Sequence, residues 1–346
     1  MSAIIPRMDL SELGEFGLID LIHTITERLK DPEHPSWQRL LIGIGDDTAA
    51  WQGNGQTQLA TTDTLVQNVH FDLKDITWEE LGWKALAINL SDIAAMGGIP
   101  QYALVSLALP GALEVENICE FYDGMARLAN ESGVAIVGGN IAVAPNVVIT
   151  VFLLGSAKNE KILRRSSATP GEQIAVTGYL GLSAACLMML KERTSLDAET
   201  TKILRQGHFR PVPRVREGQV LVDQGIKTAI DISDGLIADL GHICEASEVS
   251  AEVRIEQVPI HPLVKANFQN YQQLALGGGE DYELLFTANK ADIERVRQTI
   301  HYPITIIGNI TQEGLPDRVT LLDAKGNITG YEKGGWEHFK DGAVEA

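Results

Sequence analysis

The sequence is poor in basic residues for its length. Its 346 residues include 28 Lys and Arg against 46 Asp and Glu, which gives a formal net charge of −18. Proteins that bind nucleic acid rely on clustered Lys and Arg to neutralise phosphates, so this composition argues against nucleic acid as a partner. An acidic protein can still bind a polyphosphate if metal ions lie between the two anions.

Cysteines and long apolar runs are also scarce. Cys119, Cys186 and Cys244 are far apart in the sequence and form no Cys-x-x-Cys pair, which argues against a disulfide framework or a zinc site and is typical of a reducing compartment. The first residues lack the apolar core of a signal peptide, and no apolar run reaches the roughly 18 residues of a membrane span. We therefore expect a cytoplasmic protein that does not enter the membrane.

Several familiar motifs are absent. The sequence has no Gly-x-x-x-x-Gly-Lys-Ser/Thr phosphate loop, no Gly-x-Gly-x-x-Gly, no His-Glu-x-x-His and no Gly-x-Ser-x-Gly. These absences argue against a P-loop enzyme, a classical dinucleotide-binding fold, a zinc protease and an α/β-hydrolase. Hydrophobic residues at 45% and charged residues at 21% are nevertheless typical of a globular protein.

The order of apolar segments predicts an α/β or α+β chain of two domains. In the first domain we expect strands at Thr57–Thr64, Tyr102–Leu109, Val134–Val137 and Val147–Leu154, and helices at Leu18–Ile22, Trp78–Met96 and Glu114–Glu131. In the second we expect strands at Gln173–Thr177, Lys227–Asp231, Tyr282–Thr287 and Ile304–Ile307, helices at Leu180–Lys191 and Gly235–Ser247, and a final hairpin through Lys325-Gly326-Asn327. The polar and basic segment Ser156–Gly171 indicates the boundary, which gives domains at residues 1–156 and 157–346.

One acidic stretch, Gly43–Asp72, stands out in the first domain. Asp46, Asp47 and Asp63 lie among glycines, hydroxyl residues and apolar residues, and no Lys or Arg occurs between Leu40 and Lys74. Buried carboxylates need cations or hydrogen-bond donors, and oxygen ligands favour Mg²⁺. The stretch predicts a magnesium site, although turns with solvated acidic tips would also explain it.

A fourth carboxylate, Asp92, lies on the apolar face of the predicted helix after Trp78. Leu81, Ala85 and Ile88 form one stripe of that helix, and Asp92 continues it. The carboxylate either caps a neighbouring backbone segment or binds a metal close to Asp63.

Two further acidic segments follow in the second domain. Asp231-Ile232-Ser233-Asp234-Gly235 joins a predicted strand to a predicted helix, so Asp231 and Asp234 lie at a strand end, where ligands gather in open α/β sheets. They could be helix caps, or they could hold Mg²⁺ while Ser233 donates to a phosphate. Gly277-Gly278-Gly279 precedes Glu280, and three glycines let the backbone approach a ligand closely, so Glu280 is a candidate ligand contact.

Together these segments resemble the thiamine-monophosphate kinase family. The resemblance rests on Gly43-Ile44-Gly45-Asp46-Asp47, Thr61-Thr62-Asp63-Thr64, Asn89 to Gly97, Asp231 to Leu236 and Gly278 to Leu284, and extends from about Gly14 to Phe339. It implies the two-domain fold of the aminoimidazole-ribonucleotide synthetase-like ATP-binding superfamily. In that fold the N-terminal mixed sheet forms a barrel in a homodimer, the C-terminal domain is an α/β sandwich, and ATP and several Mg²⁺ bind near the dimer interface.

The resemblance also implies roles for individual residues. The Mg²⁺ ligands would be Asp47, Thr61, Thr62, Asp63, Asp92, Asp231 and Asp234, of which Asp63, Asp92 and Asp234 would be essential for catalysis. The nucleotide would contact Tyr122, Gly139, Asn140, Arg165 and Ser233, and the thiamine end of the substrate would contact His70, Glu280 and Trp336. Trp336 and His70 would otherwise be interpreted as packed side chains.

One residue departs from the family pattern. The family has Gly-Gly-Asp where this sequence has Gly138-Gly139-Asn140, and the family's Asp is a metal ligand. An amide oxygen can coordinate Mg²⁺ but brings no charge, so we expect one weakened Mg²⁺ site.

The implied reaction is ATP-dependent phosphorylation of thiamine monophosphate to thiamine diphosphate. Two alternatives remain: another ATP-dependent enzyme of the superfamily, or a non-catalytic binder of nucleotide or thiamine phosphate in which Asn140 marks lost catalysis. Selenophosphate synthesis is disfavoured, because that family has a reactive cysteine near its start and this sequence has none before Cys119.

Overall fold

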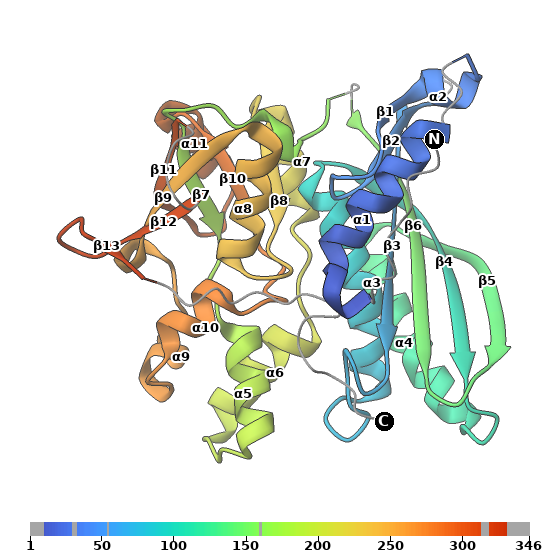
Figure 1. The fold of residues 1–346 in the computed structure, drawn as a ribbon. Helices are drawn as coiled ribbons and strands as arrows, with labels where there is room; N and C mark the ends of the chain where they lie inside the picture. The colour runs from blue at the N-terminus through green and yellow to red at the C-terminus, as the bar shows by residue number, and fades with distance from the viewer. Residues whose placement is uncertain (1–9, 30–32, 54, 159–160, 313–317, 331–346) are drawn as a thin grey trace.

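The computed structural model describes residues 10–29, 33–53, 55–158, 161–312 and 318–330. These residues form two lobes, each built on one β-sheet, that lie side by side (Figure 1). Within the described residues, no helix is long and apolar enough to cross a membrane.

The N-terminal lobe contains a six-stranded sheet in the order β1-β2-β3-β6-β4-β5. Only β4 and β5 run parallel; the other neighbours are antiparallel. The strands are β1 (Leu40–Ile42), β2 (Ala49–Gln52), β3 (Thr57–Val66), β4 (Ile99–Leu109), β5 (Ala135–Val143) and β6 (Val148–Ser156). The helices of this lobe are α1 (Leu10–Leu29), α2 (Pro35–Arg39), α3 (Trp78–Ala95) and α4 (Val115–Ser132).

Helices α3 and α4 pack together on one face of this sheet. The sequence starts α3 sharply, because Thr77 and Glu80 form a reciprocal capping box at its N-terminus. The two helices lie in close backbone contact: a Cβ on Gly82 would lie 1.8 Å from the carbonyl oxygen of Phe121, and one on Gly124 would lie 1.9 Å from that of Glu79. Glycine at these two positions therefore fixes how α3 lies in the lobe.

The C-terminal lobe is a sandwich around a seven-stranded sheet in the order β13-β12-β9-β11-β7-β10-β8. Helix α8 covers one face of the sheet, while α7 and α11 cover the other. The strands are β7 (Gln173–Thr177), β8 (Thr228–Asp231), β9 (Val249–Arg254), β10 (Leu284–Ala288), β11 (Ile304–Gln312), β12 (Val319–Leu322) and β13 (Ile328–Thr329). The helices are α5 (Leu182–Glu192), α6 (Ala198–Phe209), α7 (Val215–Asp223), α8 (Leu236–Ser247), α9 (Pro262–Asn267), α10 (Tyr271–Gly277) and α11 (Lys290–Thr299), with short 3₁₀ turns η2 (Arg165–Ser167) and η3 (Ile255–Gln257).

Helix α3 lies between the lobes. It packs on β3 and β6 of its own sheet and also on α7 and β8 of the other lobe. The approach of α7 is close, since a Cβ on Gly218 would lie 2.0 Å from the carbonyl oxygen of Ala94. Any side chain on the inner faces of α3 can therefore reach both lobes.

Most predicted elements are confirmed, with two corrections. The strand predicted at Val134–Val137 is too short, because β5 continues through Gly138-Gly139-Asn140 to Val143, paired in parallel with β4. The helix predicted at Leu18–Ile22 is one part of the longer α1, which is kinked at Gly14 (φ 75°). The hairpin through Lys325-Gly326-Asn327 is confirmed, since β12 and β13 pair across it.

Candidate active site

Three carboxylates from distant parts of the sequence meet between the lobes. Asp47 precedes β2, Asp92 lies near the end of α3, and Asp231 is the last residue of β8. Each offers one oxygen, and these oxygens lie within 4.8 Å of one another. Asp47 and Asp231 are buried, at 8% and 2% exposure. We call these three residues the carboxylate cluster.

Strand β3 adds two side chains to the edge of this cluster. Because side chains alternate along a strand, Thr61 and Asp63 share the face that α3 covers. Thr61 Oγ1 donates a 2.5 Å hydrogen bond to Asp92 Oδ2, and the backbone N–H of Asp63 donates to Asn89 Oδ1 at 3.2 Å. Thr62 is exposed, and its hydroxyl donates to the carbonyl oxygen of Val151, so its side chain is not part of the cluster.

The acids of this region are held at unusual pKa values. Burial raises the pKa of Asp231 to about 8, with a further contribution from the charge of Asp47. Burial raises the pKa of Asp63 to about 6. For Asp92, burial and then the charges of Asp63 and Asp231 raise the pKa well above its usual range. A bound cation stabilises the ionised form of such buried carboxylates, because it offsets both their mutual repulsion and their lost hydration.

Among the described residues, one cation, Arg165, contacts the cluster. Arg165, in η2, contacts Asp47 Oδ1 through Nη2 at 2.6 Å, and its backbone N–H donates to Asp46 Oδ2 at 3.3 Å. Two buried polar atoms here, Asp47 Oδ2 and Arg165 Nε, have no hydrogen-bond partner within the part of the chain that the structure describes. A single guanidinium therefore leaves the cluster with uncompensated negative charge and a free carboxylate oxygen.

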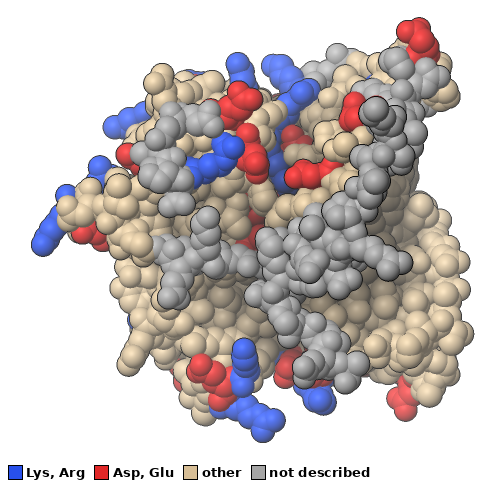
Figure 2. All heavy atoms as spheres, viewed as in Figure 1, with Lys and Arg blue, Asp and Glu red and all other residues tan. Residues whose placement is uncertain are grey.

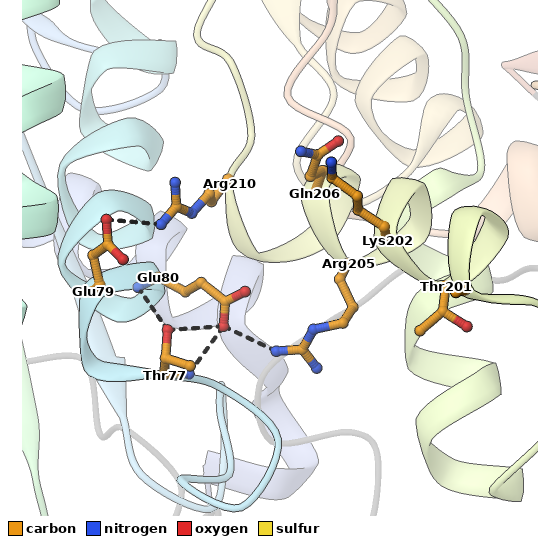
Figure 3. A pocket seen from close by; sticks show the side chains of 9 residues that line it. Thr77, Glu79, Glu80, Thr201, Lys202, Arg205, Gln206 and Arg210 are labelled. Carbon is orange, nitrogen blue, oxygen red and sulfur yellow. Dashed lines mark hydrogen bonds and ion pairs between the residues drawn. The ribbon is translucent and has the colours of Figure 1, made fainter.

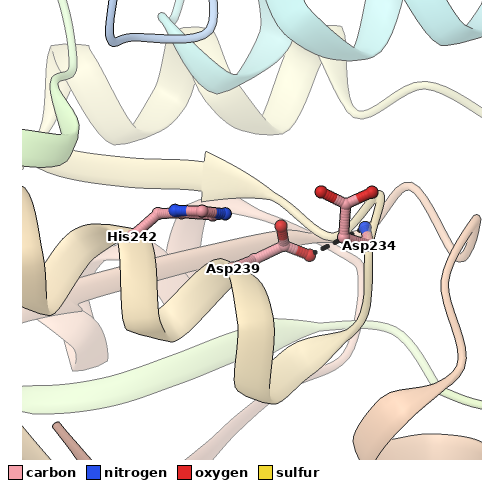
Figure 4. A group of neighbouring side chains, drawn as sticks. All are labelled: Asp234, Asp239 and His242. Atoms are coloured by element: carbon pink, nitrogen blue, oxygen red, sulfur yellow. Dashed lines mark hydrogen bonds between the residues drawn. The ribbon is translucent and has the colours of Figure 1, made fainter. Parts of the chain in front are cut away.

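Asp234 lies in a second acidic group, next to the first. In Figure 4 its side chain lies near Asp239 and His242, both on α8, and the three offer atoms within 4.8 Å of one another. Asp239 is 1% exposed, and its Oδ2 accepts hydrogen bonds from the backbone N–H groups of Ser233, Asp234 and Gly235 at 3.0–3.1 Å. This carboxylate thus shapes the turn that carries Ser233 and Asp234.

Two of the candidate thiamine contacts, Glu280 and His70, lie close enough to interact electrostatically. Glu280 is partly buried and forms an ion pair with Lys84 Nζ at 2.8 Å. His70 is half-buried, and its Nδ1 accepts from the backbone N–H of Val66 at 3.0 Å. Trp336 lies outside the described residues.

The candidate nucleotide contacts fall into two groups. Arg165 and Ser233 lie beside the acidic groups described above. Gly139 and Asn140 lie on the exposed part of β5, and Tyr122 is half-buried on α4 with its ring edge-on to Phe121. Gly139 also has a steric role, because a Cβ there would lie 1.8 Å from the Val105 carbonyl oxygen.

A separate cavity of about 560 Å³ lies at the start of α3, against α6 (Figure 3). Two ion pairs in its lining join the lobes: Glu79 with Arg210, and Glu80 with Arg205, at 2.9 Å each. Thr77 and Asp92 are 15 residues apart, or roughly 22 Å along the helix. The cavity therefore lies far from the carboxylate cluster.

The surface view agrees with a charged cleft. Figure 2 shows Asp and Glu side chains, together with Lys and Arg, on both walls of the hollow between the lobes in the upper part of the view. The Arg165–Asp47 pair bridges the same two lobes.

Comparison with known proteins identifies the class first. Residues 45–157 match the N-terminal domain of AIR synthase related proteins, and residues 169–318 match the C-terminal domain. Structures of the hydrogenase maturation protein HypE share this fold, one with a TM-score of 0.69 at 18% identity. The chain is thus an AIR synthase related protein with both domains of that class.

More similar proteins narrow the assignment. Thiamine-monophosphate kinase from Bacillus subtilis (strain 168) is 38% identical over 93% of this chain and 99% of the relative. A solved structure of AaThiL complexed with AMPPCP and TMP is 36% identical with a TM-score of 0.82, covering 96% of this chain and 99% of that one. The enzyme from Stenotrophomonas maltophilia K279a gives a TM-score of 0.72 at 34% identity, covering 91% and 98%. The chain belongs to the thiamine-monophosphate kinase family.

Proposed function

We propose that this protein transfers the γ-phosphoryl group of ATP to thiamine monophosphate, giving ADP and thiamine diphosphate. The observation that carries the proposal is the carboxylate cluster of Asp47, Asp92 and Asp231, assembled between the two lobes of a thiamine-monophosphate kinase fold. The related AaThiL structure contains AMPPCP and TMP together, which supports the same pair of substrates here.

Magnesium fits the residues of this site. Asp47 Oδ2 is buried and has no hydrogen-bond partner among the described residues, and the neighbouring acids have raised pKa values because they are buried together. Hard oxygen ligands of this kind suit Mg²⁺. The residues that would hold it are Asp47, Thr61, Thr62, Asp63, Asp92, Asp231 and Asp234; Thr62 would have to use its backbone carbonyl, because its side chain points to the other face of the sheet. When bound, Mg²⁺ would offset the repulsion between the two phosphate groups.

The reaction needs little acid–base chemistry from the protein. The nucleophile is a phosphate oxygen of the substrate, and the second pKa of a phosphate ester is about 6, so the group is already ionised at neutral pH. The protein's task is to align two anions for in-line transfer. Arg165 and the Ser233 hydroxyl would bind nucleotide phosphates, while Glu280 and His70, with Trp336, would hold the thiamine end.

We also propose a homodimer formed through the open face of the N-terminal sheet. Along β4, Tyr102 and Leu104 alternate with buried residues and are 51% and 39% exposed, and exposed apolar patches of this kind mark protein interfaces. A second copy would cover this face, and Tyr122, Gly139 and Asn140 would then contact nucleotide near the interface. Sedimentation of Leu104→Lys as a monomer, with the wild type as a dimer, would support this arrangement.

Two further assignments complete the proposal. Residues 1–156 form the ATP- and Mg²⁺-binding domain and residues 157–346 the C-terminal domain, with α3 joining the two. A cytoplasmic location is consistent with a substrate pair made inside cells.

The test is direct. Purified protein is incubated with ATP and thiamine monophosphate over a range of Mg²⁺ concentrations, and thiamine diphosphate and ADP are measured together. The proposal predicts both products in equal amounts. Binding of both substrates without either product would instead support the non-catalytic binder.

A further inference from the structure

We propose that Lys84 is a positioning residue that acts through Glu280: it holds the Glu280 carboxylate ionised and oriented toward the thiamine end of the substrate. This inference rests on the proposed function, because it takes Glu280 as a substrate contact. It adds a residue of α3 that no similarity assigns to the site.

Lys84 is placed where a lysine is costly. It is the only Lys or Arg in α3, and its side chain is 1% exposed. Its Nζ lies 2.8 Å from Glu280 Oε1. A buried ammonium group without a partner is strongly unfavourable, so Lys84 and Glu280 depend on each other.

A histidine completes this arrangement. His208, on α6 and 2% exposed, has Nε2 at 3.5 Å from Lys84 Nζ and Nδ1 at 3.4 Å from Glu280 Oε2. Burial, together with the charge of Lys84, lowers the pKa of His208 to about 3, so the ring is neutral. Because an ammonium group only donates, Nε2 is the accepting nitrogen, and Nδ1–H faces Glu280 and the Ser183 hydroxyl, 2.8 Å away.

The backbone of Glu280 is held equally firmly. Its φ of +64° is in the left-handed region, and its N–H donates to the Ser233 carbonyl oxygen at 2.7 Å. Gly279 before it packs on the same turn, since a Cβ there would lie 2.3 Å from that oxygen. The Glu280 loop is therefore attached to the phosphate-side turn, while its side chain is attached to α3.

The part of the Glu280 side chain that stays exposed is available for contact with a substrate. Its side chain keeps 25% exposure although Lys84 and His208 occupy both carboxylate oxygens from the buried side. Lys84 and Asp92 are eight residues apart, roughly 12 Å along α3. Helix α3 thus sets the distance between the Glu280 contact and the carboxylate cluster. A substrate with a ring at one end and a phosphate at the other needs two such separated contacts.

A double-mutant cycle tests this role. Steady-state kinetics are measured for wild type, Lys84→Met, Glu280→Gln and the double variant, at saturating ATP and Mg²⁺. We expect Lys84→Met to raise KM for thiamine monophosphate about tenfold, or about 1.4 kcal/mol, with KM for ATP unchanged. In the Glu280→Gln background the same substitution should change KM no further, because Lys84 acts through Glu280.

Each other outcome is informative. Additive effects would mean that Lys84 contacts the substrate itself, and an unchanged KM in Lys84→Met would mean that the pair is only structural; either result overturns the proposal. Arg297→Met is the control, since it removes a partly buried guanidinium on α11 that binds the Ile304 carbonyl oxygen, and it should lose stability without changing KM. If Lys84→Met does not fold, the double variant can still be compared with Glu280→Gln. A higher KM for thiamine monophosphate in the double variant would contradict the proposal. Absence of turnover in the wild type would be a failure of the proposed function itself.

Discussion

Ser91 Oγ donates a 2.6 Å hydrogen bond to Asp231 Oδ2, and both residues are buried. Ser91 lies on α3 of the N-terminal lobe, whereas Asp231 ends β8 of the C-terminal lobe. The bond therefore joins the two lobes at the carboxylate cluster, next to Asp92. An intact site therefore requires both lobes in register.

Asp92→Asn should abolish turnover and yet stabilise the metal-free protein. The substitution removes a charge that burial and neighbouring acids disfavour, so without Mg²⁺ the variant should unfold at a higher temperature than wild type. Adding Mg²⁺ should stabilise wild type by mass action and the variant much less. Asp223→Asn, which removes an exposed partner of Lys158, should behave as wild type. An active Asp92→Asn enzyme would rule out the metal-binding role.

Asp239→Ala should impair catalysis without removing a substrate contact. Three backbone N–H groups lose their acceptor, at about 1–3 kcal/mol for each that stays buried and unsatisfied, so the turn carrying Ser233 and Asp234 should loosen. We expect kcat to fall at least tenfold and the Mg²⁺ requirement to rise. Asp239→Asn keeps an accepting oxygen and should recover part of the loss. Equal kinetics for Asp239→Ala and wild type would contradict this role.

His208 should make stability depend on pH below neutrality. Its pKa is about 3 in the folded protein against 6.5 for the free side chain. The unfolded chain therefore takes up a proton below pH 6.5 that the folded protein does not, and stability falls as the pH falls toward 3. Between pH 7 and 5 the wild type should lose about 2 kcal/mol more than His208→Gln, as measured by urea unfolding. If the free energy of unfolding changed with pH in the same way for both proteins, His208 would not be the source of the pH dependence.

Asn140→Asp should lower the Mg²⁺ concentration needed for half-maximal activity. Asn140 is exposed on β5 opposite Ser106, so we expect the added charge to be tolerated and to strengthen the proposed Mg²⁺ site. The Mg²⁺ titration should shift severalfold with no change in melting temperature. An unchanged titration would mean that this position does not bind the metal in this protein.

The acidic residues of the site could be predicted because each lies in a short sequence pattern that determines its position on a helix or at a strand end. Asp92 continues an apolar stripe on one helix, and Asp231 ends a strand that leads directly into a helix, so each could be recognised within a few residues of sequence. The helix and strand positions followed from the same periodicities, and the glycine stop after Met96 is where α3 ends.

The supporting residues could not be predicted in the same way. Lys84 and Glu280 are 196 residues apart in the sequence. Neither local segment contains a pattern that predicts contact with the other. The signal for Lys84 was present, as a lone lysine within an apolar helix, but a side chain that reaches the surface would give the same pattern. For Asp239, a surface position on α8 would fit its spacing equally well. The strand predicted at Val134–Val137 stops before Gly138-Gly139 because glycine disfavours strands, but the pairing of β5 with β4 overrides that local preference.

The most direct test of the account is coupled product formation by wild type and Asp92→Asn under identical conditions. With ATP, thiamine monophosphate and Mg²⁺, the wild type should produce thiamine diphosphate and ADP in equal amounts, and Asp92→Asn should produce neither while still folding cooperatively. Release of ADP without thiamine diphosphate, or product formation that survives the loss of the Asp92 carboxylate, would contradict the account.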